Sequence, residues 1–194
     1  ERDFARVQFK NGSVALVDLR NQKGVAFDKS GDPLQGEARD ELVADGWAAW
    51  VNDSFWLNPM AKAYDSGTAR EAVTLEDGRE GVLVKYDAGG LTPGDSYLWI
   101  LGEDGLPVAG RMWVSNIPVK GVEFSWEDWK TLPGGAKVAA KHSGPIDIHI
   151  TEIKGAKELS DLTGDEEDPF AALVAAGTRA AQPAPEGPSS RPAR

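Results

Sequence analysis

The sequence contains two histidines, the side chains most often used for proton transfer and metal binding near neutral pH. His142 and His149 flank the turn at Gly144–Pro145, so they lie on neighbouring predicted strands and could approach one another. A metal site would still need a carboxylate, which Asp147 or Glu152 would supply. The simpler interpretation is that both histidines are sheet-surface residues. We adopt it and expect no metal.

Other catalytic signatures are missing from the sequence. There is no cysteine, which excludes a thiolate nucleophile and a thiolate metal site. No serine lies in a Gly-x-Ser-x-Gly elbow, and neither glycine-rich phosphate-binding fingerprint occurs. The loop from Asp87 to Asp95 holds carboxylates that could wrap a calcium ion, but it lacks the ligand spacing of a calcium-binding loop. A hairpin connection in which Asp95 caps a turn through its own backbone explains the same residues. We therefore expect no enzyme and no cofactor.

Aromatic residues are the best-supported functional feature. The chain has seven tryptophans, and large aromatic side chains build either a core or a ligand pocket. Several of them fall on one predicted helix and on predicted strands, which favours an aromatic-lined cavity between a sheet and a helical lid. A plain packed core is the alternative. The predicted ligand-binding residues are Trp47, Trp50, Phe55, Trp56, Trp99 and Trp113.

The elements that would position these residues follow from hydrophobic periodicity. Between residues 37 and 55 apolar residues recur every three or four positions, which predicts one amphipathic helix. The segments on either side alternate as strands do, and their connections are too short for crossover helices, so neighbours should pair antiparallel. The predicted strands cover residues 4–9, 14–19, 24–28, 70–75, 82–86, 97–101, 108–114, 122–126, 137–141 and 146–153.

One predicted strand is apolar on both faces. In Tyr97–Leu101 every residue is apolar or aromatic, so both sides of this strand need a cover. The helix that carries Trp47 and Trp50 is the expected lid over one of them.

Composition limits the partners. The net charge of −10 argues against nucleic acid, which needs a positive surface, and disfavours adsorption to anionic lipid headgroups. No apolar run approaches the roughly 20 residues of a membrane helix, so any membrane contact should be peripheral. We expect one folded domain over residues 1–159, an acidic segment with a short helix over 160–176, and a disordered tail over 177–194.

Three segments resemble proteins of the LolA/LolB superfamily of outer-membrane lipoprotein carriers, in a bacterial envelope branch distinct from the carriers themselves. They are Trp50–Pro59, Gly90–Ile100, and Arg111–Val114 with Ile117–Pro118. The resemblance extends loosely from Phe4 to Ala156. It implies an α+β fold in which a strongly curved antiparallel sheet, an incomplete β-barrel, is capped by a helix and encloses an apolar cavity for acyl chains.

The function implied by the resemblance is a non-catalytic carrier or binding module in the periplasm or cell envelope of a Gram-negative bacterium. Its partner would be a lipid or the acyl chain of a lipoprotein. Relatives have a leader, a helix and further strands before the position of Phe4, which this chain lacks, so its first hairpin should carry an open edge suited to a homodimer. The alternatives are an interaction protein with a packed core and an open sheet edge, and an envelope hydrolase using Asp87 and Asp95.

Overall fold

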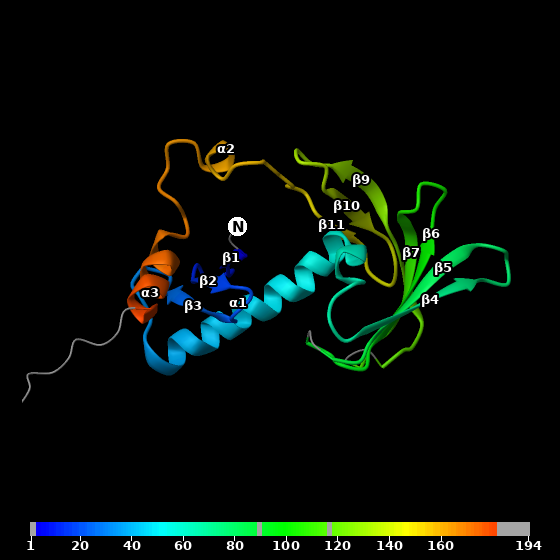
Figure 1. The fold of residues 1–194 in the computed structure, drawn as a ribbon, viewed down its shortest axis with the longest axis horizontal. Helices are drawn as coiled ribbons and strands as arrows, with labels where there is room; N and C mark the ends of the chain where they lie inside the picture. Colours follow the sequence, from blue (N-terminus) through cyan, green and yellow to red (C-terminus); the bar gives the residue numbers. More distant parts are fainter. Residues whose placement is uncertain (1–2, 89–90, 116–117, 182–194) are drawn as a thin grey trace, which may run out of the picture. The chain divides into compact units, whose positions relative to one another are not determined.

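The computed structural model describes residues 3–88, 91–115 and 118–181. The described chain is α+β, with three antiparallel sheets that form no closed barrel within these residues, so the predicted class is confirmed at this level. The chain divides into two compact units, one made of residues 1–49 and 166–194 and the other of residues 50–165 (Figure 1). The first and last segments thus share a unit, which the division of the sequence at residue 159 did not include.

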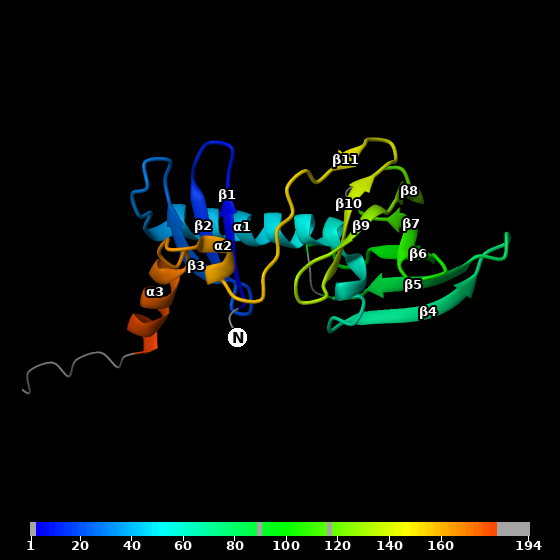
Figure 2. The ribbon, with the colours of Figure 1, turned by 90° about the horizontal axis from the view of Figure 1, so that it is seen from above.

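The first unit joins three N-terminal strands to helices from both ends of the chain (Figure 2). Its sheet has the order β1-β2-β3, and Ala15, Val17 and Ala26 form a core with Val43 of the helix. Gly46 faces this core, because a Cβ at that position would lie 2.7 Å from the Cβ of Ala15. The elements are β1 (Phe4–Gln8), β2 (Val14–Asp18), β3 (Lys23–Phe27), the start of α1 (Gly36–Leu57) and α3 (Ala171–Ala181).

The second unit contains a five-stranded antiparallel sheet of order β4-β5-β6-β7-β8 and a three-stranded sheet of order β11-β10-β9. The end of α1 and a short 3-10 helix, η1 (Pro59–Lys62), precede them, and α2 (Ser160–Thr163) follows. The strands are β4 (Thr68–Thr74), β5 (Glu80–Tyr86), β6 (Ser96–Leu101), β7 (Pro107–Trp113), β8 (Val122–Ser125), β9 (Glu127–Thr131), β10 (Lys137–His142) and β11 (Ile148–His149).

Register divides the side chains of the five-stranded sheet between two faces. Val82, Trp99 and Gly110 stand opposite one another across β5, β6 and β7, and we call their side the inner face. One position along, Leu83, Leu98 and Arg111 are aligned on the outer face. Successive side chains of a strand point to opposite faces, so β6 presents apolar groups to both sides, as its sequence indicated.

Two strands near the end of the sheet region, β9 and β11, differ from what the sequence predicted. β9 was not predicted, because it follows β8 directly after Trp126 without a glycine or proline between them. Asp128, with a φ of 53°, lies within β9. The predicted strand 146–153 is reduced to β11, which spans two residues. The Ile150 amide still donates to the Ala140 carbonyl at 2.9 Å, so an irregular contact replaces the expected ladder.

The predicted tail also begins later than expected. Helix α3 runs to Ala181, past Gly177, so the prediction of disorder is wrong for residues 177–181. The segment is rich in alanine, which has the highest helix propensity, and this outweighs the single glycine. Residues 182–194 lie outside the described residues.

Candidate functional site

Aromatic side chains gather on the inner face of the five-stranded sheet. Trp99 is fully buried, and its ring centroid lies 5.0 Å from that of Trp126 and 5.4 Å from that of Phe55. Trp56 stacks on Trp126 at 5.4 Å with the ring planes 8° apart. We call this set the aromatic cluster. Its members are Phe55, Trp56, Tyr86, Tyr97, Trp99, Phe124, Trp126 and His142.

The middle of the aromatic cluster is tightly packed. A Cβ on Gly110 would lie 2.4 Å from Cζ3 of Trp99 and 3.2 Å from Cζ3 of Trp126. Real carbon atoms do not approach so closely, so the Trp99 indole occupies the space that a side chain on β7 would fill. At this point the cluster behaves as core, with ring contacts in place of a ligand surface.

One end of the aromatic cluster holds a buried carboxylate. Asp95 is 2% exposed, and its Oδ1 accepts a hydrogen bond from the Ser115 amide at 2.8 Å. This bond joins two loops 20 residues apart. The backbone of Asp95 also closes its own turn, as the sequence suggested, because its amide donates to the Thr92 carbonyl at 3.3 Å and its carbonyl accepts from the Tyr86 amide at 3.0 Å. Burial raises the pKa of the Tyr86 phenol to about 12, and burial, followed by the nearby Asp95, raises the pKa of Tyr97. Both phenols therefore stay neutral at physiological pH.

His142 lies at the other end of the aromatic cluster. Its Nδ1 is 3.0 Å from the Ser125 carbonyl, which can only accept, so Nδ1 carries the hydrogen. Register places His142 opposite Ile148 and His149 opposite Lys141, so the two histidines point to opposite faces. The expectation that both lie on the sheet surface is wrong for His142, which is fully buried. No group of three or more His, Asp or Glu side chains in the described part of the chain is placed to hold a metal ion.

The stability of the protein should depend on pH through His142. Burial lowers the pKa of His142 below its ordinary value of 6.5, although hydrogen bonds to the backbone of Ser125 and Trp56 oppose this. The unfolded chain then binds the proton more tightly, so the free energy of unfolding should fall as pH drops through about 6.5. Urea unfolding followed by circular dichroism between about pH 7.5 and pH 5.5 would measure it.

The matched variants are His142→Phe and His149→Gln. His142→Phe should flatten the pH dependence, whereas His149→Gln should keep it, because His149 is exposed. An unchanged slope in His142→Phe would contradict the assignment.

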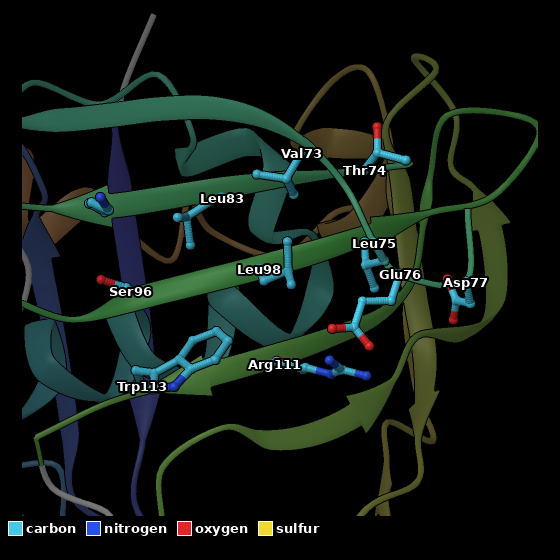
Figure 3. Close-up of a pocket in the computed structure, with 11 residues that line it drawn as sticks. Val73, Thr74, Leu75, Glu76, Asp77, Leu83, Ser96, Leu98, Arg111 and Trp113 are labelled. Carbon is cyan, nitrogen blue, oxygen red and sulfur yellow. The ribbon is translucent and has the colours of Figure 1, made fainter. Parts of the chain in front are cut away.

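An open groove of about 820 Å³ lies on the outer face of the same sheet (Figure 3). Its volume is in the range of small-molecule sites. Leu83 and Leu98 stand opposite one another at its centre, with Val73 and Trp113 on either side (Figure 3). We call it the outer groove. Its lining residues are Val73, Thr74, Leu75, Glu76, Asp77, Leu83, Lys85, Ser96, Leu98, Arg111 and Trp113.

The connection between β4 and β5 closes one end of the outer groove. Gly81 has no side chain, and a Cβ there would lie 3.1 Å from Leu98 Cδ1 and 3.3 Å from Leu75 Cδ1. The Leu75 side chain can therefore lie down against the sheet, and Glu76 follows it over the outer face (Figure 3). At the other end Lys85, Ser96 and Trp113 form one cross-strand row.

The rim of the outer groove carries ion pairs. Arg111 Nε contacts Glu123 Oε2 at 2.6 Å, and Arg79 Nη2 contacts Asp77 Oδ2 at 2.8 Å. Both pairs are largely exposed, so they contribute little to stability. Hydrogen bonding to Arg79 lowers the pKa of Asp77, which stays ionised at neutral pH. The groove thus combines an apolar floor with a rim of fixed charge.

The structure separates the six residues predicted to line one cavity. Phe55, Trp56 and Trp99 come together in the aromatic cluster. Trp47 packs against the core of the first unit, and Trp50 lies under the Lys62 ammonium, 4.8 Å from Nζ. Only Trp113 of the six lines the outer groove, and it is 37% exposed.

Sequence reasoning missed most of the outer groove. Its leucines and valine occupy ordinary alternating positions of predicted strands, and no motif marks them. The apolar character of Leu98 in a strand that is apolar on both faces was the one available signal.

The described residues contain no helix that is long and apolar enough to cross a membrane. No family model, curated protein or solved structure matches the chain.

Proposed function

We propose that residues 50–165 form a non-catalytic binding module that holds the acyl chain of a lipid or lipoprotein in the outer groove. The observation that supports this most directly is an apolar floor of Leu83 and Leu98 inside a groove of about 820 Å³. Each CH₂ of a chain that leaves water gains about 0.8 kcal/mol, so a half-covered chain can bind. Lining residues in the described part of the chain include no histidine or cysteine, which favours binding over chemistry.

The resemblance to the LolA/LolB superfamily supports the choice of an acyl chain. On that resemblance the sheet corresponds to a strongly curved, helix-capped incomplete barrel, and the protein acts in the periplasm or cell envelope of a Gram-negative bacterium. The proposal differs from that resemblance in the position of the ligand. It places the acyl chain on the outer face of the sheet, because the aromatic cluster occupies the inner face.

Replacing Trp113 by alanine should weaken binding about tenfold. The indole flanks the floor of the groove and is partly exposed, so a bound chain would cover part of its area, and about 1.4 kcal/mol corresponds to tenfold. The measurement is a titration of the full chain with the fluorescent methyl ester of a long-chain fatty acid, which has no charge.

Trp50→Ala is the matched control, because Trp50 lies outside the outer groove. A loss of affinity in Trp50→Ala with none in Trp113→Ala would contradict the outer groove as the binding site. It would indicate that the ligand binds beside the helix that carries Trp50, as predicted from the sequence.

An interaction protein is the second candidate, because β4 is an open edge. In the described residues it pairs only with β5, and five of its seven residues are exposed. Such an edge can accept a partner strand, including that of a second copy, although the charges of Arg70 and Glu71 oppose non-specific pairing. Failure of every apolar probe to bind the wild-type chain would favour this function.

A further inference from the structure

We propose that the ligand of the outer groove is a long-chain carboxylate, whose head group is bound by Lys85 and whose chain runs across Leu83 and Leu98 toward Leu75. This inference rests on the proposed function and specifies its ligand. Its basis is the row of Lys85, Ser96 and Trp113 at the end of the groove opposite the β4–β5 connection.

Lys85 is the cation of the outer groove that lacks a fixed counter-charge. Arg111, the other basic lining residue, is paired with Glu123 at 2.6 Å. Figure 3 also shows the Glu76 carboxylate beside the Arg111 guanidinium. Within the described residues Lys85 makes no ion pair. Two carboxylates flank it on its face without an ion pair to it. Glu71 is opposite Leu83 and hence a diagonal neighbour, about 7–8 Å away by strand geometry, and Asp87 follows two residues along the chain.

Two further donors lie in the same row. Ser96 stands opposite Lys85 on one side and opposite Trp113 on the other. Neither the Ser96 hydroxyl nor the Trp113 indole N–H makes a hydrogen bond to the described part of the chain. A carboxylate placed over Ser96 would thus meet an ammonium and a hydroxyl, both donors and neither already engaged, whereas the nitrogen edge of the Trp113 indole lies by Gly121 on the β8 side of β7 (Figure 3).

Polarity changes along the groove in the order that an amphiphile requires. Beyond the donor row come Leu83 and Leu98, then Val73 and Leu75. A chain with its head at Lys85 therefore lies on apolar side chains and ends beneath the β4–β5 connection. The reverse orientation would bring the head toward Glu76 and Asp77, which repel an anion.

Charge balance favours a monoanion. One ammonium faces the head group, and Glu71 on the diagonal disfavours a second negative charge. A carboxylate fits this balance, whereas a dianionic phosphate monoester would leave one charge uncompensated.

The test compares a fluorescent long-chain fatty acid with its methyl ester on the full chain. The wild type should bind the acid about tenfold more tightly than the ester. This is the expected contribution of one charge-assisted hydrogen bond at an exposed site. Lys85→Met keeps the aliphatic stem and should bind both probes with the affinity of the ester. Lys62→Met, which changes a lysine outside the groove, should keep the preference for the acid.

The possible results distinguish the role of Lys85 from the proposed function itself. Equal binding of acid and ester by the wild type, or a preference that survives in Lys85→Met, would overturn the role of Lys85 while leaving the proposed function in place. Binding of neither probe would refute the proposed function itself. An alkyl phosphate of the same chain length should bind no more tightly than the acid at neutral pH, and tighter binding would overturn the carboxylate assignment.

Discussion

Replacement of Trp99 by alanine is expected to lower the free energy of unfolding by about 3–5 kcal/mol, the usual cost of deleting a large buried aromatic side chain. Trp99 is fully buried, stacks parallel to Tyr97 at 5.6 Å, and meets Trp126 edge-on at 5.0 Å. The cavity left behind could not close from the side of β7, because Gly110 offers no side chain to fill it. Urea unfolding followed by far-ultraviolet circular dichroism would give the difference.

Trp113→Ala is the matched control for stability. Trp113 lies on β7, beside β6, but on the outer face with 37% of its surface exposed, so its loss should cost clearly less than the loss of the fully buried Trp99. Equal destabilisation by the two variants would contradict the assignment of Trp99 to the core and Trp113 to the groove.

A Trp99→Phe variant keeps the test decisive if Trp99→Ala does not fold. Phenylalanine leaves a smaller cavity, and it removes an indole N–H that has no hydrogen-bond partner among the described residues. Loss of a buried unpaired donor offsets part of the lost packing, so Trp99→Phe should cost clearly less than Trp99→Ala. A cost as large as that of alanine would show that the indole N–H is satisfied.

Periodicity predicted most elements of this fold but not the way in which their faces meet. The helix expected over residues 37–55 is α1, and the strands expected over residues 4–9 and 14–19 pair antiparallel as β1 and β2. These features depend on local patterns of apolar and turn residues, which any reader of the sequence can count. Asp128 shows the limit, because a left-handed φ of 53° at an aspartate leaves no signature in the residues around it.

The candidate site was harder to predict, because it depends on strand register. Trp47, Trp50 and Phe55 all fit one helix pattern, yet Trp47 and Phe55 pack into the cores of different units. In β6 the sequence indicated that both faces need a cover. It did not indicate that Trp99 would face the aromatic cluster while Leu98 faces a groove. That outcome follows from which residues of β5 and β7 stand opposite, a long-range property.

His142 illustrates the same limit for a titratable residue. The sequence placed it at the end of a predicted strand and favoured a position on the sheet surface. In the structure it contacts Trp56 and Trp126, from elements far away in sequence. Its burial depends on those tertiary contacts, so composition and alternation could not have revealed it.

Leu98→Asp should abolish binding of the uncharged fatty-acid ester, with an affinity at least about 100-fold lower than that of the wild type. Leu98 lies on the floor of the outer groove, opposite Leu83 and Arg111. A chain in the groove would strip water from the new carboxylate, and its neighbour Arg111 is already paired with Glu123. Burial of a charge that lacks a cation of its own costs several kcal/mol, where about 2.7 kcal/mol already corresponds to 100-fold. The fluorescence titration used for Trp113→Ala measures this loss.

Val108→Asp is the control for placing an aspartate in a strand of this sheet. Val108 lies on β7 and is 44% exposed, but it does not line the outer groove, so binding should be retained. If Leu98→Asp fails to fold, Leu98→Trp provides a second route, because a bulkier apolar side chain fills the groove without introducing charge. Full binding by a folded Leu98→Asp or Leu98→Trp protein would contradict the proposal that the acyl chain binds on the outer face. No acyl chain could lie along Leu83 without covering residue 98.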